Sequence, residues 1–153
     1  MSGVGVVVLG VALLVSALGA LWVRARDGAV RAPMSSVGGQ GAQVTTQSVL
    51  AGLGIDPGAA DLTVVQFSTA FCAPCRQTRA RLQQMQTSRP GLAYVHVDAE
   101  SHLDEVRRLD VRRTPTLFYL DRAGTLLGRS SGAPRPAELE ALADAHAPVG
   151  GGR

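Results

Sequence analysis

The feature that most constrains the fold of this 153-residue chain is its cysteine usage, just two residues placed three positions apart. Cys72 and Cys75 follow closely after residues 62–68 (LTVVQFS), a run with the composition of a buried β-strand. A structural disulfide needs cysteines that are distant in sequence, because closing a long loop gives the larger stabilisation. The pair therefore indicates chemistry rather than a structural crosslink.

A helix is expected to start at the cysteine pair. Pro74 suits a first helical turn, where its missing N–H would have no partner. Residues at helical spacing form the expected inner face: Cys75, Thr78, Leu82 and Met85. Arg79 is expected on the outer face of this helix. The helix ends before Pro90, and residues 92–97 (LAYVHV) form the next strand, so we predict a parallel βαβ unit.

The remaining pattern completes an α/β fold. Its predicted elements are a first helix over 46–53, a helix opened by Ser101 and Asp104 as a capping box, a hairpin of strands 116–120 and 125–130, and a last helix starting near Pro136. The order helix, β, α, β, α, β, β, α predicts a mixed sheet of about four strands with helices on both faces.

The position of the cysteines predicts disulfide exchange. Cys72 would lie at a helix N-terminus, where unpaired N–H groups and the helix dipole favour a thiolate, the nucleophilic form of cysteine. Cys75 lies about one helical turn further on and on the same face. We therefore expect the outer Cys72 to form a mixed disulfide with a substrate and the inner Cys75 to resolve it.

Residues 46–147 resemble the thioredoxin family. The resemblance rests on VVQFS before FCAPC, on VHVD over 95–98, on Thr114-Pro115-Thr116, and on Gly124 and Gly132 around the hairpin. More narrowly, the chain resembles membrane-anchored thioredoxins of actinobacteria. The resemblance implies a thioredoxin-like fold, a redox-active Cys72–Cys75 disulfide, no cofactor, and a cis peptide bond before Pro115. The residues that it implies for substrate binding are Phe71, Ala73, Pro74, Thr114 and Pro115.

The chain departs from the family pattern in the cysteine motif and in the residues behind it. In the motif, Ala73 after Phe71 stands where the family usually has Gly after Trp, which keeps an apolar rim but leaves the reduction potential open. Gln66 replaces the buried acid that thioredoxins carry six residues before the first cysteine, and Tyr94 replaces its lysine partner. A carboxamide cannot take a proton from Cys75, so we expect deprotonation of this second thiol to depend on water or on substrate groups.

A zinc site is the alternative interpretation of a C-x-x-C pair. Two more ligands would have to come from His96, His102 and His146, and their spacing does not match a zinc knuckle. We expect no metal. His96 is interpreted as a structural strand residue, and the other two as solvated helix residues.

Residues 3–23 form an uncharged apolar segment long enough for a membrane anchor, since 21 helical residues span roughly 30 Å. A cleaved signal peptide is the alternative, but no basic segment precedes the apolar run. Residues 24–45 are Gly- and Ser-containing and are interpreted as a flexible juxtamembrane linker, and residues 148–153 as a disordered tail. Arg24, Arg26 and Arg31 favour a cytoplasmic location for the following domain.

The net charge is only +3, the basic residues form no stripe, and aromatic residues are few. These features exclude a nucleic-acid-binding protein. Arg76, Arg112 and Arg113 flank the cysteine and proline motifs, and they are either groups around the active site or ordinary exposed charges.

The sequence thus predicts a membrane-tethered protein-disulfide reductase with disulfide-containing protein substrates and electrons from a thioredoxin reductase or another dithiol donor. Two alternatives stay open: an extracytoplasmic reductase serving cytochrome c maturation, and a non-catalytic redox-sensing domain.

Overall fold

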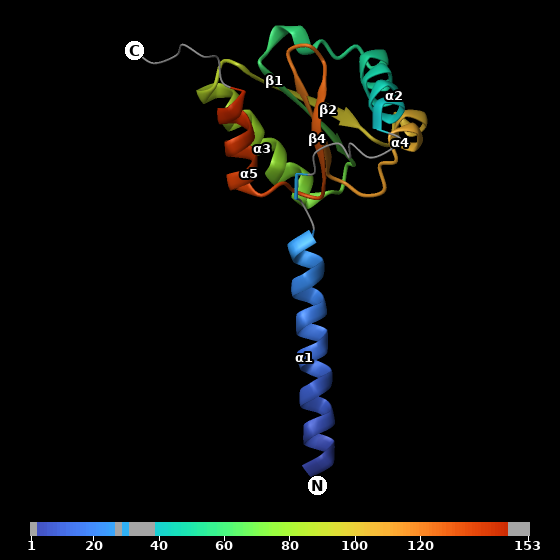
Figure 1. Ribbon diagram of the computed structural model, residues 1–153, viewed down its shortest axis with the longest axis vertical. Helices are drawn as coiled ribbons and strands as arrows, with labels where there is room; N and C mark the ends of the chain where they lie inside the picture. The colour runs from blue at the N-terminus through green and yellow to red at the C-terminus, as the bar shows by residue number, and fades with distance from the viewer. Residues whose placement is uncertain (1–2, 27–28, 31–38, 147–153) are drawn as a thin grey trace.

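A computed structural model describes residues 3–26, 29–30 and 39–146 (Figure 1). Its elements in chain order are α1 Gly3–Arg26, α2 Gly39–Gly52, the 3-10 turn Pro57–Ala59, β1 Leu62–Ser68, α3 Ala73–Ser88, β2 Leu92–Asp98, α4 Leu103–Arg108, β3 Thr116–Asp121, β4 Leu126–Ser131 and α5 Pro136–Ala145. The elements follow the predicted order, and the predicted strand limits differ from the observed ones by at most one residue.

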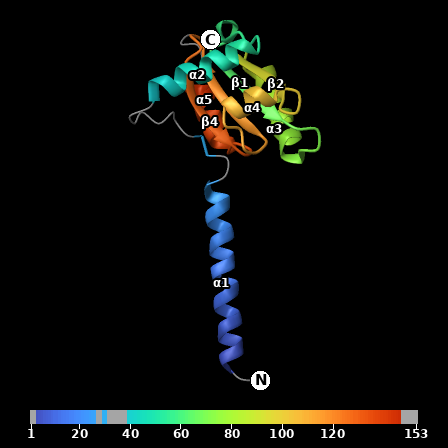
Figure 2. The same cartoon turned by 90° about the vertical axis from the view of Figure 1, so that its right-hand side faces the viewer.

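The four strands form one mixed sheet in the order β2-β1-β3-β4. β1 pairs with β2 in parallel, β3 pairs antiparallel with β1, and β4 pairs antiparallel with β3. Helices α3 and α5 cover one face of the sheet, and α2 and α4 cover the other (Figures 1 and 2). The predicted thioredoxin-like fold, a four-stranded mixed sheet with helices on both faces, is confirmed.

Strand β1 lies in the middle of the sheet, and all seven of its residues are buried. Its side chains alternate between two apolar clusters, because successive residues of a strand point to opposite faces. Phe67 packs edge-on against Phe118 in the cluster beneath α2 and α4. Val64 contributes to the cluster beneath α3 and α5, which also holds Leu82 and Leu139. A rigid, doubly covered β1 therefore leads directly into the cysteine pair.

The first domain helix is longer than predicted. α2 begins at Gly39, inside the segment interpreted as a linker, and not at residue 46. Val49 and Leu50 anchor its C-terminal half in the core, and helix propagation from such an anchor costs little, even through Gly41. The rest of the linker (27–28, 31–38) and the tail 148–153 lie outside the described residues, so their predicted flexibility stays a prediction.

The predicted capping box at the start of α4 is wrong. His102 is the N-cap residue and no side chain caps this helix. The Ser101 hydroxyl donates to Asp98 Oδ2 at 2.6 Å, a charge-assisted bond that ties Ser101 to the end of β2, one residue before the helix N-cap.

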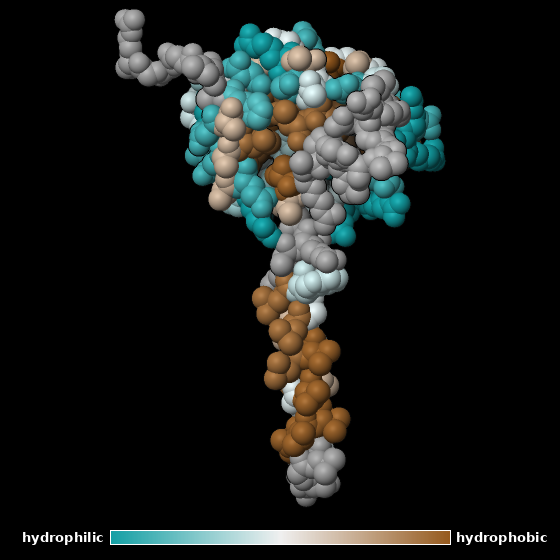
Figure 3. Space-filling view, viewed as in Figure 1, coloured by the Kyte–Doolittle hydropathy of each residue, from teal (hydrophilic) through white to brown (hydrophobic). Residues whose placement is uncertain are grey.

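Helix α1 projects from the domain, and apolar side chains cover most of its middle part (Figure 3). Its segment Gly5–Trp22 is long and apolar enough to cross a membrane, and none of it is buried within the protein. A signal sequence meets the same criteria of length and composition. Beyond α1, Val30 packs on the cluster beneath α5, and its N–H donates to Glu138 Oε2 at 2.9 Å.

Candidate active site

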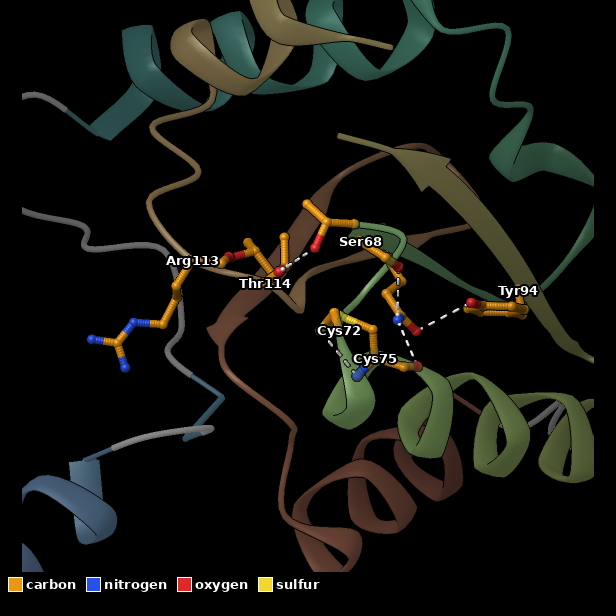
Figure 4. The surroundings of a disulfide bond; sticks show 9 residues. Ser68, Cys72, Cys75, Tyr94, Arg113 and Thr114 are labelled. Carbon is orange, nitrogen blue, oxygen red and sulfur yellow. Dashed lines mark hydrogen bonds between the residues drawn. A yellow bond between two sulfur atoms is a disulfide. The ribbon is translucent and has the colours of Figure 1, made fainter. Parts of the chain in front are cut away.

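Cys72 and Cys75 form a disulfide at the N-terminus of α3, with their Cα atoms 5.2 Å apart (Figure 4). Cys72 is the N-cap residue, and its backbone is extended. Its Sγ accepts a hydrogen bond from the Cys75 N–H at 3.2 Å. The sulfur thus lies where free N–H groups and the helix dipole stabilise negative charge. This is the position that the sequence predicted for the two cysteines.

The two cysteines differ in exposure. Cys75 is only 3% exposed, whereas Cys72 is half-buried and lies beside fully accessible neighbours. Phe71 is 96% exposed, and Ala73 and Pro74 are also exposed. A partner protein can therefore reach the sulfur of Cys72, surrounded by an apolar rim, before that of Cys75.

The loop before β3 lies across from the disulfide. The Thr114–Pro115 peptide bond is cis, as the family resemblance implies. The hydroxyls of Thr69 and Thr114 are hydrogen-bonded at 3.3 Å, which joins this loop to the segment that leads into the cysteines (Figure 4). Pro115 is buried, and its carbonyl accepts from the Gly132 N–H at 2.7 Å. The structure therefore brings together the cysteine and proline motifs, which are about forty residues apart in sequence.

The sheet and the cysteine motif lie within one known protein family. The family model described as Thioredoxin matches residues 56–145, more than half of the chain. The chain belongs to the thioredoxin family. The match includes both cysteines and Pro115, and it leaves α1 and the whole of α2 outside.

Individual relatives agree with this assignment. Thioredoxin H4-1 of Oryza sativa subsp. japonica is 33% identical over 87 residues, which cover 54% of this chain and 65% of that protein. The chain thus spans somewhat less than two thirds of the length of the curated thioredoxins that it matches. Among solved structures, Fasciola hepatica thioredoxin aligns with a TM-score of 0.54 at 22% identity, over 65% of this chain and 93% of that one. Chlamydomonas reinhardtii thioredoxin f2 gives 0.53 at 24% identity, over 61% and 86%. These two structures show the shared fold.

Gln66, the unusual residue of this thioredoxin, is fully buried beneath α3. Its Nε2 donates to the Cys75 carbonyl and to Ser68 Oγ, both at 3.0 Å. Its Oε1 accepts from the Tyr94 hydroxyl at 3.1 Å (Figure 4). The two departures from the family pattern therefore compensate each other: a neutral hydrogen-bonded pair occupies the site where an acid and a lysine were expected. Sequence analysis singled out both residues but did not predict this bond.

Two of the three arginines near the motifs do not line the disulfide. Arg112 pairs with Asp110 at 2.7 Å. The side chain of Arg113 points away from the cysteines (Figure 4). Arg76 instead lines a cavity beside Cys75, as does Arg79, which is half-buried and not on an exposed outer face as predicted. Its position four residues after Cys75 is the sequence signal from which its place near the site could have been predicted.

The histidines lie on separate elements. His102 Nδ1 is 2.9 Å from the Asp98 carbonyl, and His146 Nδ1 is 2.9 Å from the Leu142 carbonyl. His96 is exposed on β2, which differs from the packed role predicted for it. Across residues 3–26, 29–30 and 39–146, no three potential metal ligands of the Cys, His, Asp or Glu type form a group.

Proposed function

We propose that this thioredoxin reduces disulfide bonds in other proteins by dithiol exchange through Cys72 and Cys75. The observation that carries the proposal is the geometry of the pair: Cys72 caps α3 and is half-buried, and the buried Cys75 is disulfide-bonded to it. Family membership supports the same class of chemistry. The substrate-binding role of Phe71, Ala73, Pro74, Thr114 and Pro115 belongs to this proposal.

The reaction proceeds in two exchanges. In the reduced protein, the Cys72 thiolate attacks one sulfur of the substrate disulfide, and the other substrate sulfur leaves as a thiolate. Cys75 then loses its proton and attacks the Cys72 sulfur, so that the Cys72–Cys75 bond forms and the second substrate sulfur leaves. The substrate gains two electrons and the pair is oxidised. A thioredoxin reductase or another dithiol donor would return the pair to its reduced form.

The cysteine variants test this function directly. Cys72→Ser should abolish reduction of insulin disulfides, because the one remaining thiol, that of Cys75, is buried and out of reach of a substrate disulfide. Cys75→Ser should accumulate stable mixed disulfides with substrates, visible as thiol-sensitive bands on a non-reducing gel. Turnover by Cys72→Ser at the wild-type rate would end the proposal. Absence of steady-state turnover in the wild-type protein with a reductase would favour a redox-sensing role instead.

The same proposal includes the membrane location. α1 would anchor the protein as a single N-terminal span, and the arginines that follow its apolar segment Gly5–Trp22 would keep the catalytic domain in the cytoplasm. The Val30–Glu138 contact supports a domain held close to the end of α1, since Arg26 and Val30 are only four residues apart. Disulfides of other membrane-associated proteins would then be within reach of the site.

A further inference from the structure

The second exchange raises a question of proton transfer. Cys75 attacks as a thiolate, so its proton must go to an acceptor. Gln66 cannot serve, because all its polar atoms are engaged in hydrogen bonds and a carboxamide does not titrate. Tyr94 donates its own proton to Gln66, and burial raises the pKa of this phenol despite the opposing effect of Arg79. The buried side of Cys75 therefore offers no base.

The other side of Cys75 borders a cavity of about 350 Å³. It lies between the first turns of α3 and the ends of β1 and β2. The ionisable residues that line it are Cys75, Arg76, Arg79, His96, Asp98 and Glu100. A polar space of this size holds several water molecules, each able to bridge groups that do not touch directly.

His96 faces this cavity from the strand next to Gln66. β1 and β2 are parallel, and Gln66 and His96 are Cα partners in their register. Partners in a parallel pair point to the same face of the sheet, so His96 lies beside Gln66 on the side covered by α3. Within the part of the chain that the structure describes, no hydrogen bond holds the His96 imidazole.

The other groups around the cavity are poor proton acceptors. The guanidinium groups of Arg76 and Arg79, which face it from α3, stay protonated in proteins. Asp98 accepts from the Ser101 hydroxyl and from the Glu100 N–H, and these two bonds are the main reason that its pKa is lowered. Glu100 is exposed in the loop after β2.

The imidazole of His96 is suited to accept a proton at neutral pH. Partial desolvation by neighbouring groups lowers the pKa of His96, the charge of Arg79 lowers it further, and the charge of Asp98 opposes them. The ring is therefore neutral near pH 7, with one nitrogen lone pair available.

We propose that His96 accepts the Cys75 proton through water in this cavity while Cys75 resolves the mixed disulfide, an inference that rests on the proposed function. In this step the Cys75 S–H proton passes to the imidazole, and the Cys75–Cys72 bond forms. The bond between Cys72 and the substrate sulfur breaks, and its electron pair leaves on that sulfur. The imidazolium then returns its proton, through solvent, to the departing thiolate.

The test separates the two exchanges in the full chain kept in detergent micelles. An aromatic disulfide reagent releases one coloured thiolate when Cys72 attacks and a second when Cys75 resolves, so rapid mixing gives two phases. In His96→Gln the first phase should be unchanged, and the second should slow by about 100-fold at pH 7. His146→Gln, at the end of α5, is the matched control and should keep both phases.

The pH profile gives the decisive reading. In the wild type, the rate of the second phase should increase with pH through one inflection below pH 6.5, the ordinary pKa of histidine. The rate should then stay level to pH 8. In His96→Gln this inflection should disappear, and the rate should rise continuously with pH.

Three outcomes would overturn the inference: an unchanged second phase in His96→Gln, loss of both phases together in that variant, or the selective loss appearing in Glu100→Gln instead. The proposed function fails separately, if the wild-type protein shows no first phase.

Discussion

Two pairs of polar side chains inside this thioredoxin domain are joined by hydrogen bonds. Gln66 with Tyr94 is one pair, and Tyr119 with Ser130 is another, joined at 2.9 Å between hydroxyls. A buried hydroxyl without a hydrogen-bond partner lowers the stability of the folded state by about 1–3 kcal/mol. Each pair therefore favours the packing in which its two side chains are in contact. At the residue scale, the site beneath α3 is therefore built from neutral groups.

Tyr119 makes stability depend on pH in the alkaline range. Burial raises its pKa to about 12, against the opposing hydrogen bond from Ser130. The folded pKa lies above the unfolded value of 10, so the stabilising contribution is complete below pH 10 and is lost as the pH rises to about 12. We expect the free energy of unfolding to fall by about 1.4 kcal/mol between pH 9 and pH 11 from this group.

Urea unfolding of the full chain in micelles at these two pH values measures the effect. Tyr119→Phe should show a smaller decrease than the wild type, whatever its stability at pH 9. Tyr94, whose pKa is also raised, contributes in the same direction to both proteins and cancels in the comparison. An identical decrease in the variant would contradict the assignment.

At the element scale, α3 carries the chemistry and α5 supports it. The two helices share the apolar cluster over β1, where Leu82 from α3 and Leu139 from α5 are completely buried. α5 also holds Glu138, which binds the chain after α1. Loosening α5 would therefore affect both the active-site helix and the contact with the juxtamembrane segment.

Truncation of Leu139 tests this support. Leu139→Ala leaves a cavity between the helices and the sheet, and we expect a loss of about 2–5 kcal/mol in the free energy of unfolding. Glu140→Ala, exposed on the same helix, should change it by less than about 0.5 kcal/mol. Denaturant unfolding of both variants gives the comparison, and equal losses would show that α5 is not held through Leu139.

At the scale of the whole molecule, the protein combines a compact domain with a helix whose segment Gly5–Trp22 is not buried within the described structure. Leu13, Leu14 and the other large apolar residues of α1 are more than half exposed. Exposed apolar surface on this scale requires a covering environment, and a lipid bilayer matches the length of the helix.

The proposed membrane location can be tested by fractionation and by protease accessibility. The wild-type chain should remain in the membrane pellet after an alkaline carbonate wash, and protease added to spheroplasts should leave the domain intact. Two central arginines, in Leu13→Arg/Leu14→Arg, cost about 5–7 kcal/mol of insertion energy and should release the protein to the supernatant. Leu13→Val/Leu14→Val is the matched apolar control. Digestion of the domain in spheroplasts would place it outside the cytoplasm and favour the extracytoplasmic alternative.

The sequence alone determined the order of helices and strands, the place of Cys72 at a helix start, and the buried position of Cys75. These features follow from local periodicity and from the backbone preferences of single residues, which act over one or two turns. The cis peptide bond before Pro115 was instead predicted from the family resemblance, and the structure confirms it.

Only the tertiary structure decided which side chains meet. The bond between Gln66 and Tyr94, the cavity shared by Arg79 and His96, and the contact from Val30 to Glu138 join residues from different elements. Periodicity assigns a residue to a face of its own element, but strand register and helix packing determine what lies opposite that face. Those depend on the whole core at once, and no local pattern encodes them.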